Sequence, residues 1–304
     1  MADIAPVSPT SPGSAAAPAR KGLPELLELA CELRVVFTDM DGTLLTPASK
    51  LPDNAEAVID RLQATGVRFV PTTGRTLRGV QAPFGAQARR IGFVAGNGMD
   101  VTIDGRALRH LAYDRDVLLA LARIVTEAPD PLGMCLYDAE RSYVLRREAD
   151  AMRACSDTLA DALAIAPDEL PAGPILKAAV VSRAPVAPEL AAHLQAMPPL
   201  AGRLDFAPCG EHWIDALLHG VDKADGIAQV LDALGATPQQ ALGFGDSMND
   251  AGMMRALPHG VAVANAMDSL KELCAFEIGP NSQASVIDAL DRIATIREQH
   301  GLRA

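Results

Sequence analysis

Three short polar clusters, each lying directly after a short apolar run, constrain the fold of this chain most strongly. The clusters are Asp39-Met40-Asp41-Gly42-Thr43, Thr72-Thr73-Gly74-Arg75 and Gly245-Asp246-Ser247-Met248-Asn249-Asp250. The runs before them are Val35-Val36-Phe37, Phe69-Val70 and Leu242-Gly243-Phe244. Wholly apolar strands are typical of buried parallel sheets, and such sheets bind ligands at the carboxyl ends of their strands. The sequence therefore predicts a parallel sheet with one site at that edge.

Helical periodicity separates these runs. Ala55, Val58, Ile59 and Leu62 recur at the spacing of one buried helix face. Further strands are predicted at 67–70, 93–95, 241–244 and 261–264, and further helices at 224–231 and 286–293. Because strands and helices alternate, we expect an α/β fold: a doubly wound (Rossmann-like) parallel sheet with helices on both faces.

The middle of the chain has a different pattern. Asn97-Gly98 and Asp104-Gly105 are turn pairs that predict a hairpin or flap around 101–103. Beyond it, helices are predicted at 117–125, 149–163 and 188–197, and strands at 134–137, 143–146, 175–181, 204–206 and 213–218. This order predicts a small sheet with helices on one face, which is an α+β domain inserted into the first.

Four segments follow from these patterns. We expect a flexible N-terminal tail at 1–22, a first part of the core at 23–111, the inserted domain at 112–207 and a second part of the core at 208–304. The tail is rich in proline, alanine and serine and has too few large apolar side chains to offset the entropy of ordering. It also lacks the apolar stretch of a secretory signal.

Charge and cysteine content exclude several classes of function. The chain has 27 Lys and Arg against 38 Asp and Glu, a net charge of −11, which is atypical of proteins that bind nucleic acid or an anionic membrane. Its five cysteines are scattered, a pattern typical of neither a zinc finger nor a disulfide scaffold. We expect a cytoplasmic protein that binds neither nucleic acid nor membrane, and the sequence leaves its oligomeric state open.

The polar clusters predict a metal site. Asp39, Asp41, Asp246 and Asp250 would converge on one rim of the sheet, where four carboxylates repel one another unless a cation or proton intervenes. Oxygen ligands without histidine or cysteine suit a hard divalent ion, and a site that also holds phosphate favours Mg²⁺. Nearby, Thr73 offers a hydroxyl and glycine-containing loops offer backbone N–H groups, which suit a phosphoryl group.

Taken together, the motifs resemble those of the haloacid dehalogenase (HAD) superfamily phosphatases, in the Cof-type branch with a type IIB cap. The matching segments are Asp39–Leu45, Thr73–Arg75, Gly220–Ala224 with Lys223, and Gly245–Asp250, with Asn97-Gly98 and Gly260–Ala266 as secondary signatures. The resemblance spans about Arg34 to Leu290 and includes the insertion. The chain departs from it at Ala251–Met254 and at Ser285-Val286, outside the catalytic set.

The resemblance implies a two-step phosphoryl transfer. Asp39 would attack phosphorus and become an aspartyl-phosphate. Asp41 would protonate the leaving alcohol and then deprotonate the water that hydrolyses the intermediate. Thr73 and Lys223 would bind phosphate oxygens.

The same resemblance implies how the metal is held. Mg²⁺ would be bound by Asp39, by the backbone carbonyl of Asp41 and by Asp246. Asn249 and Asp250 would orient water ligands or Lys223.

Several other residues allow two interpretations of their role. Thr73 would alternatively cap a helix that begins at Gly74, and Arg75 would form either a salt bridge or a substrate contact. Lys177, Arg146 and Arg183 lie on or beside predicted cap strands, where a solvated sheet face is favoured over substrate contact. Trp213 is expected in the core of the insertion. The six histidines show no metal-ligand spacing.

The expected activity is Mg²⁺-dependent hydrolysis of a small phosphorylated metabolite, with sugar phosphates favoured. Phosphorylated cofactors such as flavin mononucleotide or pyridoxal phosphate are the second substrate class, and a phosphomutase or phosphotransferase is a near alternative. A phosphoacceptor signalling module of receiver type is a non-enzyme alternative, although such a module needs neither Asp41 nor the insertion.

Overall fold

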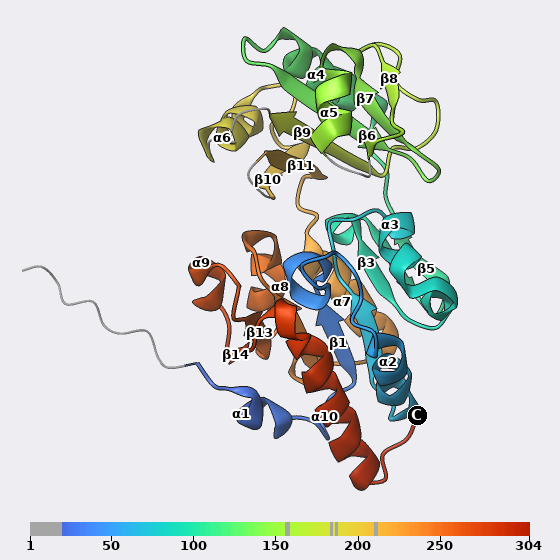
Figure 1. Cartoon of the computed structure of the whole chain (residues 1–304). Coiled ribbons are helices and arrows are strands. Elements are labelled where there is room, and N and C mark those ends of the chain that lie inside the picture. Colours follow the sequence, from blue (N-terminus) through green and yellow to red (C-terminus); the bar gives the residue numbers. More distant parts are fainter. Residues whose placement is uncertain (1–19, 156–158, 183–184, 186–187, 210–211) are drawn as a thin grey trace, which may run out of the picture.

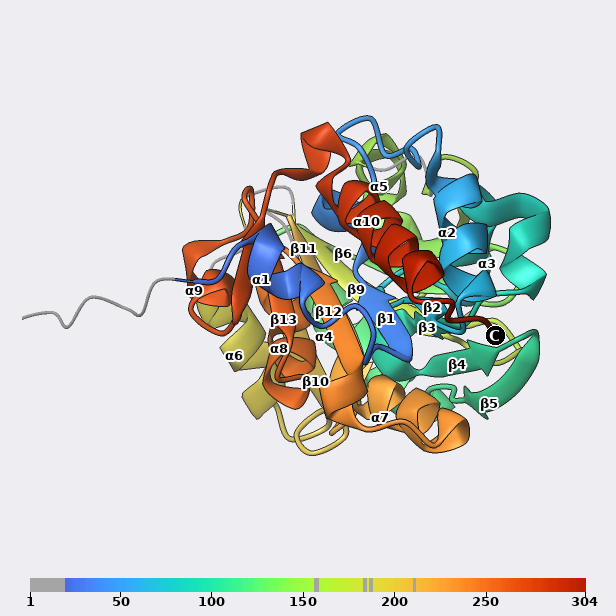
Figure 2. The same cartoon turned by 90° about the horizontal axis from the view of Figure 1, so that it is seen from below.

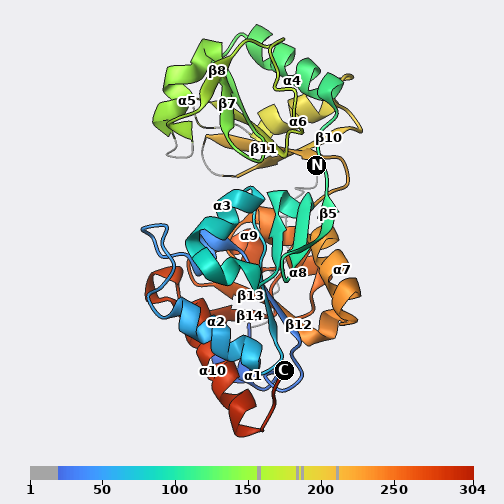
Figure 3. The ribbon, with the colours of Figure 1, turned by 90° about the vertical axis from the view of Figure 1, so that its right-hand side faces the viewer.

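The computed structural model describes residues 20–155, 159–182, 185, 188–209 and 212–304, which form two lobes (Figures 1 and 3). The first lobe, here called the core, is built on a five-stranded sheet in the order β14-β13-β12-β1-β2, and every neighbouring pair of strands is parallel. Its strands are β1 (Val35–Thr38), β2 (Arg68–Pro71), β12 (Ala241–Gly245), β13 (Gly260–Val263) and β14 (Phe276–Ile278).

Helices cover both faces of the core sheet, as Figure 2 shows. The chain forms α1 (Leu23–Leu27), α2 (Ala55–Ala64), α3 (Leu77–Gln81), α7 (Lys223–Leu234), α8 (Ala251–Ala256), α9 (Asp268–Lys271) and α10 (Ser285–Gln299). Helices α2 and α10 pack together on one face, and α7 and α8 pack together on the other. The predicted doubly wound α/β core is therefore confirmed. No helix in the described ranges has both the length and the apolar character needed to span a bilayer.

A second, antiparallel sheet lies beside β2. It contains β3 (Phe93–Ala95), β4 (Asp100–Ile103) and β5 (Arg106–His110), and a bridge between Thr72 and Val94 connects it to the end of β2. The hairpin predicted from the two turn pairs is confirmed as β4 and β5.

The second lobe, here called the cap, contains a six-stranded sheet in the order β10-β11-β9-β6-β7-β8. Its strands are β6 (Leu132–Tyr137), β7 (Ser142–Leu145), β8 (Leu163–Ile165), β9 (Lys177–Ser182), β10 (Leu204–Pro208) and β11 (Trp213–Leu218). Its helices are α4 (Arg115–Glu127), α5 (Ala149–Cys155) and α6 (Pro188–Ala196). The inserted α+β cap is thereby confirmed as the second part of the predicted fold class.

The cap differs from the prediction in the placement of its helices. Helices α4 and α6 share a buried cluster with Ala178 and Val180 of β9. Helix α5 instead packs with Ala179 and Val181, the alternate residues of the same strand, and so lies on the opposite face. The prediction of helices on one face only was wrong. The predicted insertion ended at residue 207, whereas the cap sheet includes β11 as well.

Two short strands were missed. The helix predicted at 149–163 is α5, which ends at Cys155, and Leu163 belongs to β8, which pairs in parallel with β7. Alanine and leucine favour a helix locally, so tertiary pairing overrides propensity here. Strand β14 has only three residues, too few for a periodic pattern. It is joined by Lys21, which was assigned to the tail but pairs with Phe276; residues 1–19 lie outside the described part of the chain.

Candidate active site

The three polar clusters meet at the carboxyl edge of the core sheet, on the side that faces the cap (Figure 1). Asp39 follows β1, Asp246 follows β12, and these two strands are parallel neighbours. Thr73 follows β2 on the other side of β1. Lys223 is the first residue of α7, whose N-terminus is capped by Asp222 through a 3.0 Å hydrogen bond from the Asp225 backbone N–H. The predicted convergence of the clusters is thus observed.

Lys223 links two of the carboxylates. Its Nζ donates to Asp39 Oδ1 and to Asp250 Oδ1, each at 2.5 Å, and the lysine is 1% exposed. The other carboxylate oxygen of Asp250 accepts from the backbone N–H groups of Asp246 (3.0 Å) and Ser247 (3.2 Å). Since both oxygens of Asp250 are used within the protein, this residue positions Lys223 and the loop after β12.

The charges of these side chains favour the binding of a cation. Burial, reinforced by the charges of Asp250 and Asp246 and opposed by Lys223, raises the pKa of Asp39 well above its usual range. Burial and the charge of Asp250 raise the pKa of Asp246 to about 6. For Lys223, burial acts to lower the pKa, but Asp250 and Asp39 outweigh it and the pKa is raised. One ammonium among three carboxylates leaves negative charge uncompensated.

The donor set fits a hard divalent ion. One carboxylate oxygen from each of Asp39, Asp246 and Asp250 lies within 4.8 Å of the others. Asp250 is already committed to Lys223 and two N–H groups, so Asp39 and Asp246 are the side chains that remain for a metal. Asp246 Oδ1 accepts from Thr43 Oγ1 at 3.0 Å, which orients that carboxylate. A ligand set made of oxygens, without histidine or cysteine, suits Mg²⁺.

The Asp41-Gly42 turn lies against the carboxylate of Asp246. Asp41 (φ −78°, ψ 122°) and Gly42 (φ 80°, ψ −11°) have the dihedrals of a type II turn, which requires a positive φ at its second central residue. A Cβ at Gly42 would lie 2.4 Å from Asp246 Oδ2, so only glycine fits. Asn265 Nδ2 donates to the Gly42 carbonyl at 2.8 Å and holds the turn from the side of β13.

Asp41 is paired with Arg75. Arg75 Nε donates to Asp41 Oδ2 at 2.7 Å, and a terminal nitrogen of the guanidinium donates to Oδ1 at 2.5 Å. Of the two interpretations of Arg75, the structure therefore has the salt bridge. Unlike Asp39, Asp41 is exposed. Both oxygens of its carboxylate accept hydrogen bonds from Arg75.

Thr73 does not cap a helix. Its Oγ1 accepts from the Arg75 backbone N–H at 3.2 Å, and Thr73 is 2% exposed. Helix α3 begins at Leu77, with Thr76 as its capping residue, so the alternative of a helix from Gly74 was wrong. Since the Thr73 hydroxyl oxygen only accepts in this bond, its O–H remains a donor.

Asn249 lies on the loop after Asp246 and is half-buried. Its Oδ1 accepts from Ser247 Oγ at 2.8 Å. Of the two residues predicted to assist the metal site, only Asp250 is bonded directly to Lys223 in the structure.

The cap residues singled out in the sequence have different surroundings. The Arg146 side chain is 65% exposed and pairs with Glu169, as expected for a solvated face. The same expectation for Lys177 was wrong, because its side chain is only 16% exposed and forms an ion pair with Asp215. Arg183 lies outside the described residues. Trp213 is half-buried and packs at the edge of the cluster under α5.

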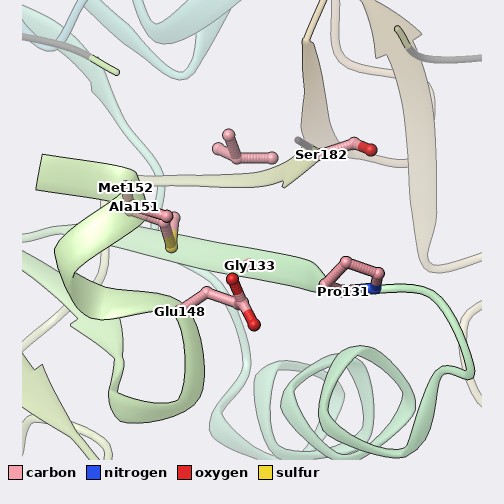
Figure 4. Close-up of a pocket in the computed structure, with 7 residues that line it drawn as sticks. Pro131, Gly133, Glu148, Ala151, Met152 and Ser182 are labelled. Carbon is pink, nitrogen blue, oxygen red and sulfur yellow. The ribbon is translucent and has the colours of Figure 1, made fainter. Parts of the chain in front are cut away.

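Several residues of the site were missed from sequence. Thr43, Asn265 and Asp215 hold other groups in place through contacts between distant segments, and only their polarity within or near the motifs hinted at a role. A small hollow in the cap, lined by Pro131, Gly133, Glu148, Ala151, Met152, Val181 and Ser182, contains none of the predicted site residues (Figure 4).

The chain is similar to known proteins along most of its length. Residues 36–290 match the family model described as haloacid dehalogenase-like hydrolase. The chain is 24% identical over 264 residues to the 5-amino-6-(5-phospho-D-ribitylamino)uracil phosphatase of Escherichia coli, covering 86% of this chain and 96% of that protein. It is 26% identical over 258 residues to the HMP-PP phosphatase of an Enterobacter species, covering 78% and 86%.

Solved structures share the fold. A Streptococcus mutans protein superposes with a TM-score of 0.79 at 21% identity, covering 85% of this chain and 98% of that one. A sugar phosphatase of HAD subclass IIB superposes with a TM-score of 0.70 at 17% identity, covering 88% and 99%. At these identities the likeness shows the arrangement of core and cap alone.

Proposed function

This chain belongs to the haloacid dehalogenase-like hydrolases, and on that premise we propose that it is a Mg²⁺-dependent phosphatase of small phosphomonoesters that works through an aspartyl-phosphate on Asp39. The single observation that supports this most strongly is the buried ammonium of Lys223, held 2.5 Å from the Asp39 carboxylate beside Asp246. A carboxylate so placed is oriented for attack on phosphorus, and the lysine reduces its repulsion of an anionic substrate.

Asp39 would form the new bond to phosphorus while the bond to the leaving alcohol breaks. Thr73 and Lys223 would donate hydrogen bonds to the phosphoryl oxygens, whose charge must be stabilised as the group transfers. Bound Mg²⁺ would supply further positive charge at those oxygens, held by Asp39, Asp246 and the Asp41 backbone carbonyl. Asp250 would keep Lys223 in position throughout, and Asn249 would orient water at the metal.

Asp41 would act as the acid and then as the base. In the first step its carboxylic acid gives a proton to the departing alkoxide, and in the second its carboxylate takes a proton from the attacking water. The water then displaces Asp39 from phosphorus, which releases inorganic phosphate, restores the Asp39 carboxylate and leaves Asp41 protonated for the next cycle.

The favoured substrates are sugar phosphates and related polyol phosphates. The Escherichia coli relative is named for a substrate with its phosphate on a ribityl chain, and the cap lies over the site, which restricts access to small molecules. Phosphorylated cofactors such as flavin mononucleotide or pyridoxal phosphate are the second class. Transfer to a sugar hydroxyl instead of water would make the protein a phosphotransferase, and a phosphorylated Asp39 that persisted for minutes would favour the signalling alternative.

Phosphate release from a panel of small phosphomonoesters tests this function. We expect release in the presence of Mg²⁺ and its loss with a chelator, because Asp39 and Asp246 repel an anionic substrate without a cation. The ranking within the panel separates sugar phosphates from phosphorylated cofactors. No release from any compound by the folded protein would contradict the proposal.

Replacing Asp41 with asparagine tests the acid and base steps. The Asp41→Asn variant cannot donate or accept the proton, so we expect turnover to fall by about a hundredfold or more. Acid-quenched samples should contain trapped phosphoenzyme with an activated donor such as acetyl phosphate, whose leaving group needs little protonation. The exposed Asp53→Asn variant serves as the control. Normal kinetics in Asp41→Asn would remove this role.

A further inference from the structure

A buried ion pair joins the cap to the loop that contains Thr73. Lys177 of β9 and Asp215 of β11 lie on the cap face opposite α4, with Nζ and Oδ1 3.0 Å apart and their side chains 16% and 4% exposed. Lys177 Nζ also donates to the backbone carbonyl of Gly74 at 2.7 Å. Asp215 Oδ2 accepts from Asn97 Nδ2 of the core at 3.0 Å. Two cap residues thus contact two core loops at one place.

All three backbone carbonyls of the segment Thr73–Arg75 accept hydrogen bonds. The Thr73 carbonyl accepts from the Asn97 backbone N–H at 2.9 Å, and the Arg75 carbonyl accepts from the Gly96 N–H at 2.8 Å. Lys177 holds the carbonyl between them. The core alone therefore supplies the outer two bonds, and the middle bond exists only while the cap is seated.

The packing at this junction is tight. A Cβ at Gly74 would lie 3.0 Å from Asp215 Oδ2 and 3.1 Å from Asn97 Nδ2, so no other residue fits there without movement. Burial acts to lower the pKa of Lys177, but Asp215 outweighs it and the pKa is raised, so the lysine stays charged. A charge-assisted bond to Gly74 is accordingly maintained inside the junction.

We propose that Lys177 and Asp215 are positioning residues through which the seated cap holds Thr73–Arg75 in its phosphate-binding conformation. This inference rests on the proposed function of Thr73. If the proposal is correct, phosphate binding depends on the cap even when the ligand has no leaving group that could contact the cap. When the cap lifts, the Gly74 carbonyl loses its donor, and the segment keeps the bonds to its outer two carbonyls, the Thr73 N–H bond to the Val94 carbonyl and the Arg75 pair with Asp41.

Trp213 provides the readout. It is the single tryptophan of the chain, and its Nε1 donates to Asp215 Oδ1 at 3.0 Å. Its fluorescence therefore reports on the junction without any label. We would titrate the protein with orthovanadate in the presence of Mg²⁺ while following tryptophan emission, and measure inhibition by vanadate in parallel. In the wild type we expect an emission change whose half-saturation matches the inhibition constant.

The first variant is Lys177→Met. We expect the vanadate concentration at half-saturation to rise by about tenfold or more, because one charge-assisted hydrogen bond is lost. Its kcat/KM should fall by the same factor for acetyl phosphate and for a sugar phosphate. Lys271→Met is the matched control, because Lys271 Nζ also donates to a backbone carbonyl, that of Ala264, and pairs with Glu277. The control should stay within about twofold of the wild type, as expected for a change outside the site.

The second variant, Lys177→Met with Asp215→Asn, removes both buried charges and so remains available if the single variant fails to fold. Its affinity for vanadate should be as low as that of the single variant, because the donor to the Gly74 carbonyl is still missing. Wild-type vanadate binding in the folded double variant would overturn the proposal, since the pair would then be merely structural. So would a loss confined to the sugar phosphate, which would make Lys177 a contact for the leaving group.

The two proposals fail in different ways. The vanadate titration needs no turnover, so a wild type that binds vanadate but releases no phosphate contradicts the proposed function and leaves the Lys177 comparison intact. A wild type that releases phosphate but binds no vanadate leaves the proposed function intact and overturns the positioning proposal.

Discussion

The Asp39→Asn variant is expected to lose turnover by at least about a thousandfold, the scale seen when a covalent nucleophile is removed. Asparagine has nearly the same shape and keeps an oxygen for Lys223, which lies 2.5 Å away. It cannot, however, attack phosphorus to form the acyl phosphate. The measurement is phosphate release at saturating Mg²⁺, together with the search for phosphoenzyme in acid-quenched samples, which should be absent.

The same variant should remain folded. Burial raises the pKa of Asp39, so the ionised carboxylate costs stability at neutral pH, and a neutral side chain removes that cost. We therefore expect Asp39→Asn to melt no lower than the wild type at pH 7 without metal. Asp232→Asn, which changes an exposed carboxylate on α7, is the control for both measurements. Substantial activity in Asp39→Asn would show that another group is the nucleophile.

The Lys223→Met variant is expected to lose both stability and activity. Methionine fills a similar volume but leaves Asp39 and Asp250, 4% and 0% exposed, without their shared counter-charge. Breaking a buried ion pair by removing one partner costs about 3–5 kcal/mol. We expect a loss of this size in the free energy of unfolding, measured by denaturant titration without metal, and a fall in turnover of about a hundredfold or more.

Two comparisons separate charge from packing in this result. Adding Mg²⁺ should recover part of the lost stability, because the ion neutralises Asp39, and the double variant with Asp39→Asn should recover part of it without metal. Lys271→Met changes a lysine of α9 with one carbonyl and one carboxylate partner, and it should lose far less stability because that carboxylate, Glu277, is also paired with Arg20. An unfolding free energy of Lys223→Met equal to that of the wild type would contradict a structural role for the lysine.

Much of the fold was predictable because its signals are local. Each buried strand of the core, apart from β14, carries an apolar run, and α2 shows its buried face as a repeat of Ala55, Val58, Ile59 and Leu62. The prediction failed where the local signal was absent, as in the three-residue β14. It also failed where the signal was misleading, as in the alanine-rich segment before β8. Strand pairing decided those segments, and pairing depends on partners far away in the sequence.

The ends of the strands, and therefore the meeting of Asp39, Thr73 and Asp246, could be predicted from local patterns, since the carboxyl ends of parallel strands share one edge. Two contacts became visible only in the folded chain: the pair of Asp41 with Arg75, and the bond from Lys177 to Gly74, 103 residues away. Neither contact follows from propensity or periodicity, because each depends on how a turn or a whole inserted domain packs against the core. Side-chain partners across such junctions are set by packing and by the need to pair every buried charge.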